Sequence, residues 1–203
     1  KFSLETLLTI GVEPIGSSDI ASLLSDFPYL SEQVANVNEI GNPVNVEQVL
    51  NLQPDLIISI QPRIADAYPQ LSEIAPTVSI EFESSEVWKD VARAIGSAVN
   101  RDAEIEVAFD TYNTRIDTLV NAIGDNQDND ISVVFLWQDF IYSYLMDTYL
   151  GTILRDAGLS ISQSQLDIAE ESDITFRLDI SREQLNLLDS EYIFVWMYSR
   201  GPE

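Results

Sequence analysis

The side chains best suited to binding a small ligand are arginines and aromatic residues at or just beyond apolar, strand-like runs. Arginine presents forked donors to oxygen-rich or anionic groups, and tryptophan and tyrosine present flat faces with a polar edge. In α/β proteins ligands bind beyond the carboxyl ends of strands, so residues at those places are the candidates. The candidate ligand-binding residues are Arg63, Trp137, Tyr142, Arg177, Trp196, Tyr198 and Arg200.

The residue types that dominate enzyme active sites and metal centres are missing from the sequence. It contains no cysteine and no histidine, which removes thiolate nucleophiles, disulfides, cysteine-type zinc sites and the usual general base. The 34 acidic residues are scattered and show no calcium-loop spacing. We therefore expect no catalytic residue, no metal site and no cofactor. An enzyme that uses a carboxylate pair, as in glycoside hydrolysis, stays open as a rival.

The charge of the chain excludes two classes of partner. Its formal net charge is −24, so it repels both phosphate backbones and anionic membrane surfaces. Nucleic-acid binding is not expected.

No run of about 18 apolar residues is present, so no membrane-spanning segment is predicted. No signal peptide is visible, and a trimmed product explains this as readily as a cytosolic protein does.

The apolar pattern predicts an N-terminal α/β unit over residues 1–84. Helices and strands alternate at short intervals there, and the strand at 56–60 is a continuous apolar run of the kind that is buried on both faces. Such strands predict a parallel sheet covered by helices. The expected helices are 4–10, 44–52 and 65–74, and the expected strands are 12–15, 56–60 and 77–82.

A helical segment follows over residues 85–124. Its second helix, expected over 101–123, would be about 34 Å long at a rise of 1.5 Å per residue. It is either a packed surface helix or a rigid connector between two lobes.

A second α/β unit is then expected over 130–203, with strands at 131–137 and 192–197 and helices at 149–157 and 180–188, the last capped by Asp179 or Ser181. Two strands would leave an exposed sheet edge, which favours a truncated lobe.

Four blocks of sequence resemble one family. Gly41 to Ser59 (GNPVNVEQVLNLQPDLIIS) and Tyr68 to Val78 resemble the substrate-binding proteins of ABC importers for ferric siderophores, haem and vitamin B12. The blocks Leu4 to Gly16 and Asp147 to Leu159 resemble the same family, in the same order. The resemblance implies two three-layer α/β/α lobes joined by a single long helix, with the ligand between them. It also implies that the second lobe is incomplete.

The resemblance gives a role to two segments of the chain that are weakly similar to each other in sequence. Asn45 to Ile58 and Ser181 to Phe194 both read as a helix with glutamate near its start, followed by an apolar strand. In this family one acidic residue on each lobe docks to arginines of the membrane permease, and the match places that role on Glu47 and Glu183. The alternative is that both residues only favour helix N-termini, where the helix dipole stabilises acids.

The resemblance implies a monomeric, non-enzymatic receptor that captures a small-molecule iron chelate, a ferric siderophore. A cobalamin or haem receptor of the same family, or a non-transport ligand-sensing domain, stays open. The implied location is periplasmic or otherwise extracytoplasmic, with a lipid anchor as an option in the full-length precursor. One departure concerns Phe135 to Asp139, where several family members carry arginine and this chain has an added acid. The ligand is therefore expected to be less anionic, or even partly cationic.

Overall fold

The computed structural model describes residues 2–61, 64–126, 130–138 and 140–197. The chain divides into two compact units, one of residues 1–83 with 87–110 and the other of residues 84–86 with 111–203. Each unit has its own apolar core and combines helices with sheet, so the predicted α/β class is confirmed. Among the described helices, none is both long and apolar enough to cross a bilayer.

The first unit begins with a helix and a short parallel strand pair. Helix α1 (Phe2–Thr9) ends before Gly11, whose φ of 73° is the left-handed geometry that glycine adopts readily. Strand β1 (Gly16–Ser17) pairs with β2 (Asn38–Glu39), and α2 (Ile20–Asp26) and η1 (Pro28–Leu30) lie between them in the chain. The strand predicted at 12–15 is wrong. Pro14 has no N–H to donate, and pairing begins only where Asn38 N–H donates to the Ile15 carbonyl at 3.1 Å.

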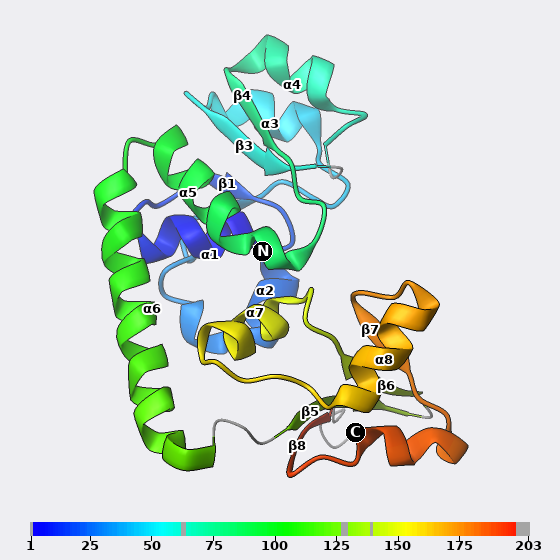
Figure 1. Ribbon diagram of the computed structural model, residues 1–203. Helices are drawn as coiled ribbons and strands as arrows, with labels where there is room; N and C mark the ends of the chain where they lie inside the picture. The colour runs from blue at the N-terminus through cyan, green and yellow to red at the C-terminus, as the bar shows by residue number, and fades with distance from the viewer. Residues whose placement is uncertain (1, 62–63, 127–129, 139, 198–203) are drawn as a thin grey trace. The chain divides into compact units, whose positions relative to one another are not determined.

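The next segment follows the predicted alternation of helix and strand. Helices α3 (Val46–Leu52) and α4 (Tyr68–Ile74) accompany the parallel pair β3 (Ile57–Ile60) and β4 (Thr77–Ile80), as Figure 1 shows. Asn45 caps α3, because its side-chain oxygen accepts a hydrogen bond from Gln48 N–H at 3.1 Å. Val49 and Leu71 are buried between these elements.

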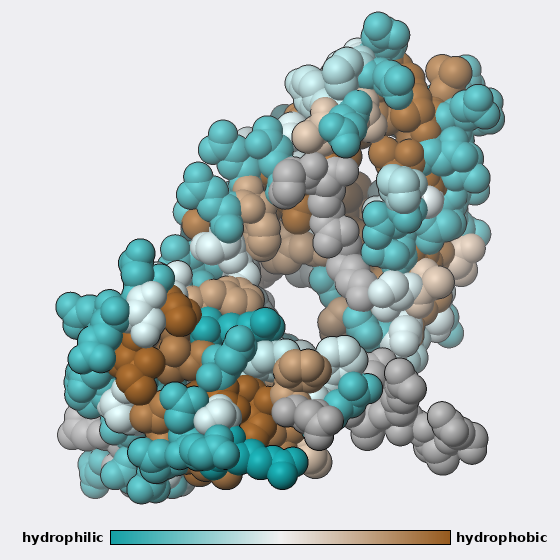
Figure 2. Space-filling view, turned by 90° about the vertical axis from the view of Figure 1, so that its right-hand side faces the viewer, coloured by the Kyte–Doolittle hydropathy of each residue, from teal (hydrophilic) through white to brown (hydrophobic). Residues whose placement is uncertain are grey.

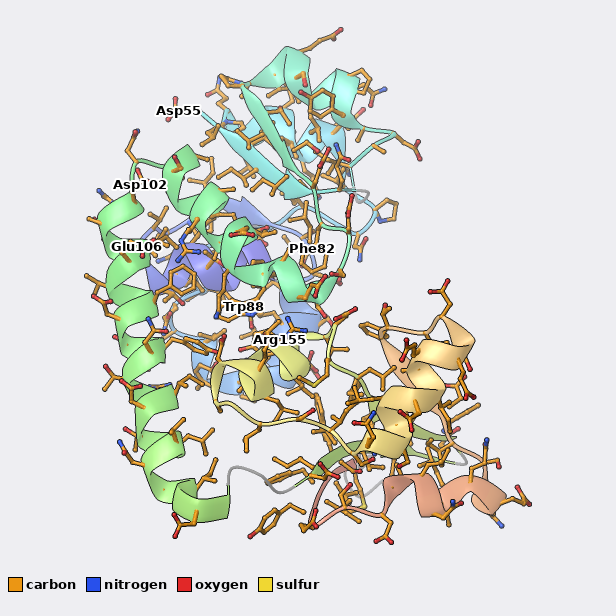
Figure 3. All side chains as sticks on the ribbon, viewed as in Figure 1. Asp55, Phe82, Trp88, Asp102, Glu106 and Arg155 are labelled. Carbon is orange, nitrogen blue, oxygen red and sulfur yellow. The ribbon has the colours of Figure 1, made fainter. Side chains whose placement is uncertain are left out.

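Two helices complete this unit after the turn η2 (Ser85–Val87). Helix α5 (Trp88–Ala98) packs on the first half of α6 (Asp102–Ile123), and the boundary between the two units falls inside α6. An ideal Cβ at Gly96 would lie 2.3 Å from Ile105 Cγ1, so only glycine permits this approach. Arg93 of α5 pairs with Glu106 of α6 at 2.9 Å, and Figure 3 labels Glu106 on that helix. The predicted helix at 101–123 is thus a single helix, and its role as a connector stays a prediction.

The second unit contains a mixed sheet with the order β7-β6-β5-β8. Strands β5 (Ile131–Trp137) and β8 (Tyr192–Met197) are parallel, whereas β6 (Phe140–Tyr144) is antiparallel to both β5 and β7 (Arg177–Asp179). The predicted count of two strands is therefore wrong. Strand β6 returns directly alongside β5, and Gln138 at the turn has the left-handed φ of 53°.

Helical elements flank this sheet. The turn η3 (Gly124–Asn126) follows α6, α7 (Tyr149–Asp156) follows β6, and α8 (Gln163–Ser172) precedes β7. The helix predicted at 180–188 is instead the 3₁₀-helix η4 (Arg182–Leu188). Of the two predicted caps the structure selects Ser181, which forms a reciprocal capping box with Gln184.

Strand β8 and the surface beside it are apolar and open. All six β8 side chains are exposed, although every one is apolar or aromatic. Next to the strand a groove of about 560 Å³ lies between the end of α6, α7 and the sheet, lined by apolar residues such as Leu119, Ile123, Val133 and Phe194. Elsewhere the surface is largely hydrophilic on the face that Figure 2 shows, with apolar patches between.

Candidate ligand-binding site

One face of the second sheet gathers aromatic side chains from three strands. The pairing places Phe135 of β5 directly opposite both Tyr142 of β6 and Trp196 of β8, so the three side chains point to the same face. Trp137 and Phe140 are the next pair on that face. We call the five residues Phe135, Trp137, Phe140, Tyr142 and Trp196 the aromatic face.

The rings of the aromatic face contact one another in a continuous series. Phe135 stacks on Tyr142 with centroids 6.2 Å apart, and its edge meets Trp196 at 5.6 Å. Phe140 stacks on Tyr142 at 6.0 Å and on Trp137 at 6.1 Å. Trp137, Phe140 and Trp196 nevertheless stay 39%, 50% and 58% exposed, so a second molecule can contact their faces.

Among the residues that the structure describes, Arg177 adds positive charge to this surface. Arg177 of β7 lies with its guanidinium carbon 4.1 Å from the centre of the Tyr142 ring. Its Nε is 3.5 Å from Asp179 Oδ1, and the two side chains are 45% and 75% exposed. A guanidinium that stacks on a ring keeps part of its donor fork available in the plane of the group. The arrangement can therefore bind a flat, oxygen-bearing molecule through ring contacts and a few directed hydrogen bonds.

Four of the seven predicted ligand residues thus lie together. Trp137, Tyr142, Arg177 and Trp196 are separated by up to 59 positions in sequence and meet because their strands are neighbours in one sheet. The other three candidates, Arg63, Tyr198 and Arg200, lie outside the described residues. Sequence reasoning missed Phe135 and Phe140. Phe135 could have been predicted, because it lies two positions before Trp137 in the same strand and so points to the same face. Phe140 could not, because its place beside Trp137 depends on the antiparallel pairing of β6 with β5.

The first unit has a polar cluster at the carboxyl ends of β1 and β2. This cluster was not predicted from the sequence. Glu39 accepts hydrogen bonds from the backbone N–H groups of Asp19, Ile20 and Gly41 at 2.8–2.9 Å. Asn42 donates to Asp19 Oδ2 at 2.9 Å, and Asp19 has the left-handed φ of 66°. The Glu39 carboxylate accepts hydrogen bonds from three backbone donors, so it holds together the loops at this strand edge.

The two predicted docking acids occupy equivalent positions. Glu47 is the second residue of α3 after its cap Asn45, and Glu183 is the second residue of η4 after its cap Ser181. Both side chains are exposed. Helix α3 is followed by the parallel strand β3, and η4 is followed by the parallel strand β8. The two segments are therefore similar in structure as well as in sequence.

The described residues show no metal centre. No group of three or more acidic residues lies close enough together to hold an ion within residues 2–61, 64–126, 130–138 and 140–197. The apolar groove beside β8 is lined almost only by carbon, so it lacks the directed polar groups that would orient an oxygen-rich ligand. The aromatic face is therefore the better candidate.

Comparison with known proteins decides the family. The model of the periplasmic binding protein family matches residues 2–203. The chain belongs to this family. Its members of known role are substrate-binding proteins, and nothing in the comparisons indicates catalysis. The resemblance drawn from the four sequence blocks is confirmed.

Among curated relatives of this periplasmic binding protein, the probable siderophore-binding lipoprotein YfiY of Bacillus subtilis is 30% identical over 96% of the chain and 60% of the relative. The achromobactin-binding periplasmic protein of Dickeya dadantii is 24% identical over 98% of the chain and 65% of the relative. The chain thus spans less than two thirds of the length of these two relatives.

A solved structure agrees with the family over nearly the whole chain. SirA of Staphylococcus aureus superposes with a TM-score of 0.83 and 25% identity, over 99% of this chain and 74% of that one. The same protein in complex with staphyloferrin B gives a TM-score of 0.80 over 97% and 68%.

Proposed function

We propose that this chain is the solute-binding component of an ABC importer and that it captures a ferric siderophore, with the aromatic face and Arg177 contacting the chelate. The gathering of four predicted residues on one sheet face carries this proposal. The relatives support it, because their names include a siderophore-binding lipoprotein, an achromobactin-binding protein and a staphyloferrin B complex.

The chemistry of the aromatic face suits such a chelate. A siderophore already fills the coordination shell of iron(III), so the protein needs no metal ligand of its own. Flat rings pack against the carbon skeleton of the chelate, and Arg177 donates to its oxygens. Ring stacking with one guanidinium recognises shape and a modest negative charge, which fits the predicted less anionic ligand.

Delivery to the permease would use the two acidic side chains. Glu47 and Glu183 are exposed at equivalent positions in the two units, where charge-assisted pairs with permease arginines would fix the orientation of docking. We place the protein outside the cytoplasm, with a lipid anchor in the full-length precursor, as the names of its relatives suggest. We propose that it acts as a monomer.

Tryptophan fluorescence tests the capture of a chelate. The protein would be titrated with ferric citrate, ferric staphyloferrin B, ferrioxamine B, cobalamin and haemin, with the iron-free compounds as controls. Saturable quenching at micromolar or lower concentration by a ferric siderophore is expected. Quenching by cobalamin or haemin alone would replace the proposed ligand class, and no response to any compound from the full-length protein would overturn the proposal.

Single tryptophan replacements then locate the bound chelate. Trp137→Phe and Trp196→Phe should each remove part of the quenched signal, because both rings belong to the aromatic face. Trp88→Phe is the control, since Trp88 packs on Phe109 in the core of the first unit at 5.8 Å. Quenching that disappears only with Trp88→Phe would place the ligand away from the aromatic face.

A further inference from the structure

Gln165 is a large polar side chain with no exposed surface. It belongs to α8, and its relative exposure is 0%. Burying an amide costs free energy unless all of its polar atoms find partners. An aliphatic residue would fill the same space without this requirement, so the position of the amide calls for an explanation beyond packing.

The amide of Gln165 is fully engaged by three elements. Its Oε1 accepts from Ser143 Oγ of β6 at 2.7 Å, and its Nε2 donates to Ser132 Oγ of β5 at 2.5 Å and to the Leu187 carbonyl of η4 at 3.1 Å. Ser132 and Ser143 are themselves 0% exposed. Both amide protons and the carbonyl oxygen are therefore satisfied in the dry interior.

The network extends through Ser132 to the junction of η4 and β8. Ser132 Oγ donates to the Leu188 carbonyl at 3.1 Å and lies 2.7 Å from Ser190 Oγ. A serine hydroxyl has one proton, so with that proton on the Leu188 carbonyl, Ser190 must be the donor of the second bond. Every hydrogen bond of the network then has a defined direction, and the bonds to the Leu187 and Leu188 carbonyls tie the end of η4 to α8 and β5.

The two faces of the sheet are linked in this way. Ser143 follows Tyr142 directly in β6, so one side chain enters the buried network while its neighbour belongs to the aromatic face. The Leu187 and Leu188 carbonyls lie at the end of η4, where helical carbonyls lack partners within the helix. Glu183 lies at the start of the same short helix.

We propose that Gln165 is a positioning residue that holds η4, and with it the docking carboxylate of Glu183, in a fixed place against β5 and β6. The positioning of η4 stands on the hydrogen bonds alone, and only the docking role of Glu183 rests on the proposed function. The network gives the docking helix a rigid base on the sheet that contacts the chelate, so that the permease meets Glu183 in one orientation.

Hydrogen exchange tests the positioning without any ligand. Gln165→Met keeps the side-chain length and removes the directed bonds, and Gln163→Met on the exposed side of the same helix is the matched control. Gln165→Met should speed amide exchange at Gln184 and Asp189 at least tenfold, while amides of α7 and the control variant stay within about threefold. Unchanged exchange in η4, or an equal acceleration throughout the unit, would overturn the proposal.

A second variant covers the case in which Gln165→Met does not fold. Ser190→Ala deletes only the outer arm of the network, at a half-buried position. It should accelerate exchange at Asp189 by several fold, and unchanged exchange there would count against the proposal.

Uptake by cells that carry the full-length protein, measured with the ferric siderophore of the titration panel that quenches its fluorescence, gives the functional readout. Gln165→Met should lower uptake about tenfold with fluorescence quenching intact, whereas loss of quenching together with uptake would contradict a role in docking. Absence of quenching by the unaltered protein would overturn the proposed function instead, and would leave the exchange result standing.

Discussion

Arg177 lies against the aromatic face, with its guanidinium carbon 4.1 Å from the Tyr142 ring centre. Replacing it by glutamine removes the charge and the forked donors but keeps a polar side chain. We expect Arg177→Gln to weaken binding of a ferric siderophore about tenfold, since losing one charge-assisted hydrogen bond at a partly exposed site costs about 1.5 kcal/mol. Arg115→Gln on the exposed side of α6 is the control. Equal affinities in fluorescence titrations of the two variants would remove Arg177 from the site.

Tyr112 predicts a pH dependence of stability. Its hydroxyl donates to Asp156 Oδ2 at 2.5 Å, and burial together with this bond raises the pKa of Tyr112 above its ordinary value. A raised pKa in the folded state means that the contribution to stability is complete below about pH 10 and is lost as the pH rises further. Tyr112→Phe should cost about 1 kcal/mol at pH 8 and flatten the decline above pH 10.

Urea unfolding between pH 8 and pH 11 measures this effect. Tyr29→Phe is the control, because Tyr29 is 73% exposed. Parallel stability curves for the Tyr112→Phe variant and the unaltered protein above pH 10 would contradict the assignment.

At the scale of elements, the contact between α5 and α6 depends on Gly96. A methyl group there would overlap Ile105, which is buried in the core of the first unit. Gly96→Ala should therefore destabilise that unit by about 1–3 kcal/mol, although alanine favours helices more than glycine does. Thermal unfolding measures the change, and Ser97→Ala on the exposed side of α5 should be neutral or slightly stabilising. A stabilised Gly96→Ala variant would show that the helices can separate without loss.

At the scale of the whole molecule, the docking proposal predicts that variants of the docking acids lose uptake of the chelate but still bind it. Glu47→Lys combined with Glu183→Lys should abolish uptake of a ferric siderophore by cells, because lysine repels permease arginines. Chelate affinity in the fluorescence titration should stay within about threefold. Glu73→Lys with Glu171→Lys, also exposed and one in each unit, makes the same change of net charge. Equal loss of uptake in the two double variants would point to charge alone and not to docking.

The sequence determined the class of the protein and most of its elements. Continuous apolar strands and helical spacing predicted α/β units. The elements that lie within a few residues of their predicted places are α1, α3, α4, α6, α7, β3, β4, β5 and β8. These elements are specified locally, by periodicity and by caps such as Asn45 and Gly11. The absence of cysteine and histidine excluded most catalytic chemistry, and four sequence blocks identified the family.

Tertiary structure decided how those elements meet. The brief β1–β2 contact follows from hydrogen bonds between segments far apart in the sequence. The β5–β6 pairing follows from a tight turn at Gln138, a residue that does not signal a hairpin in the sequence. The same pairing brought Trp137, Tyr142, Arg177 and Trp196 together and joined Phe140 to them. Gln165 gave no signal in the sequence, because a glutamine on a helix is ordinarily exposed, and only packing α8 on the sheet enclosed its amide among serines and carbonyls.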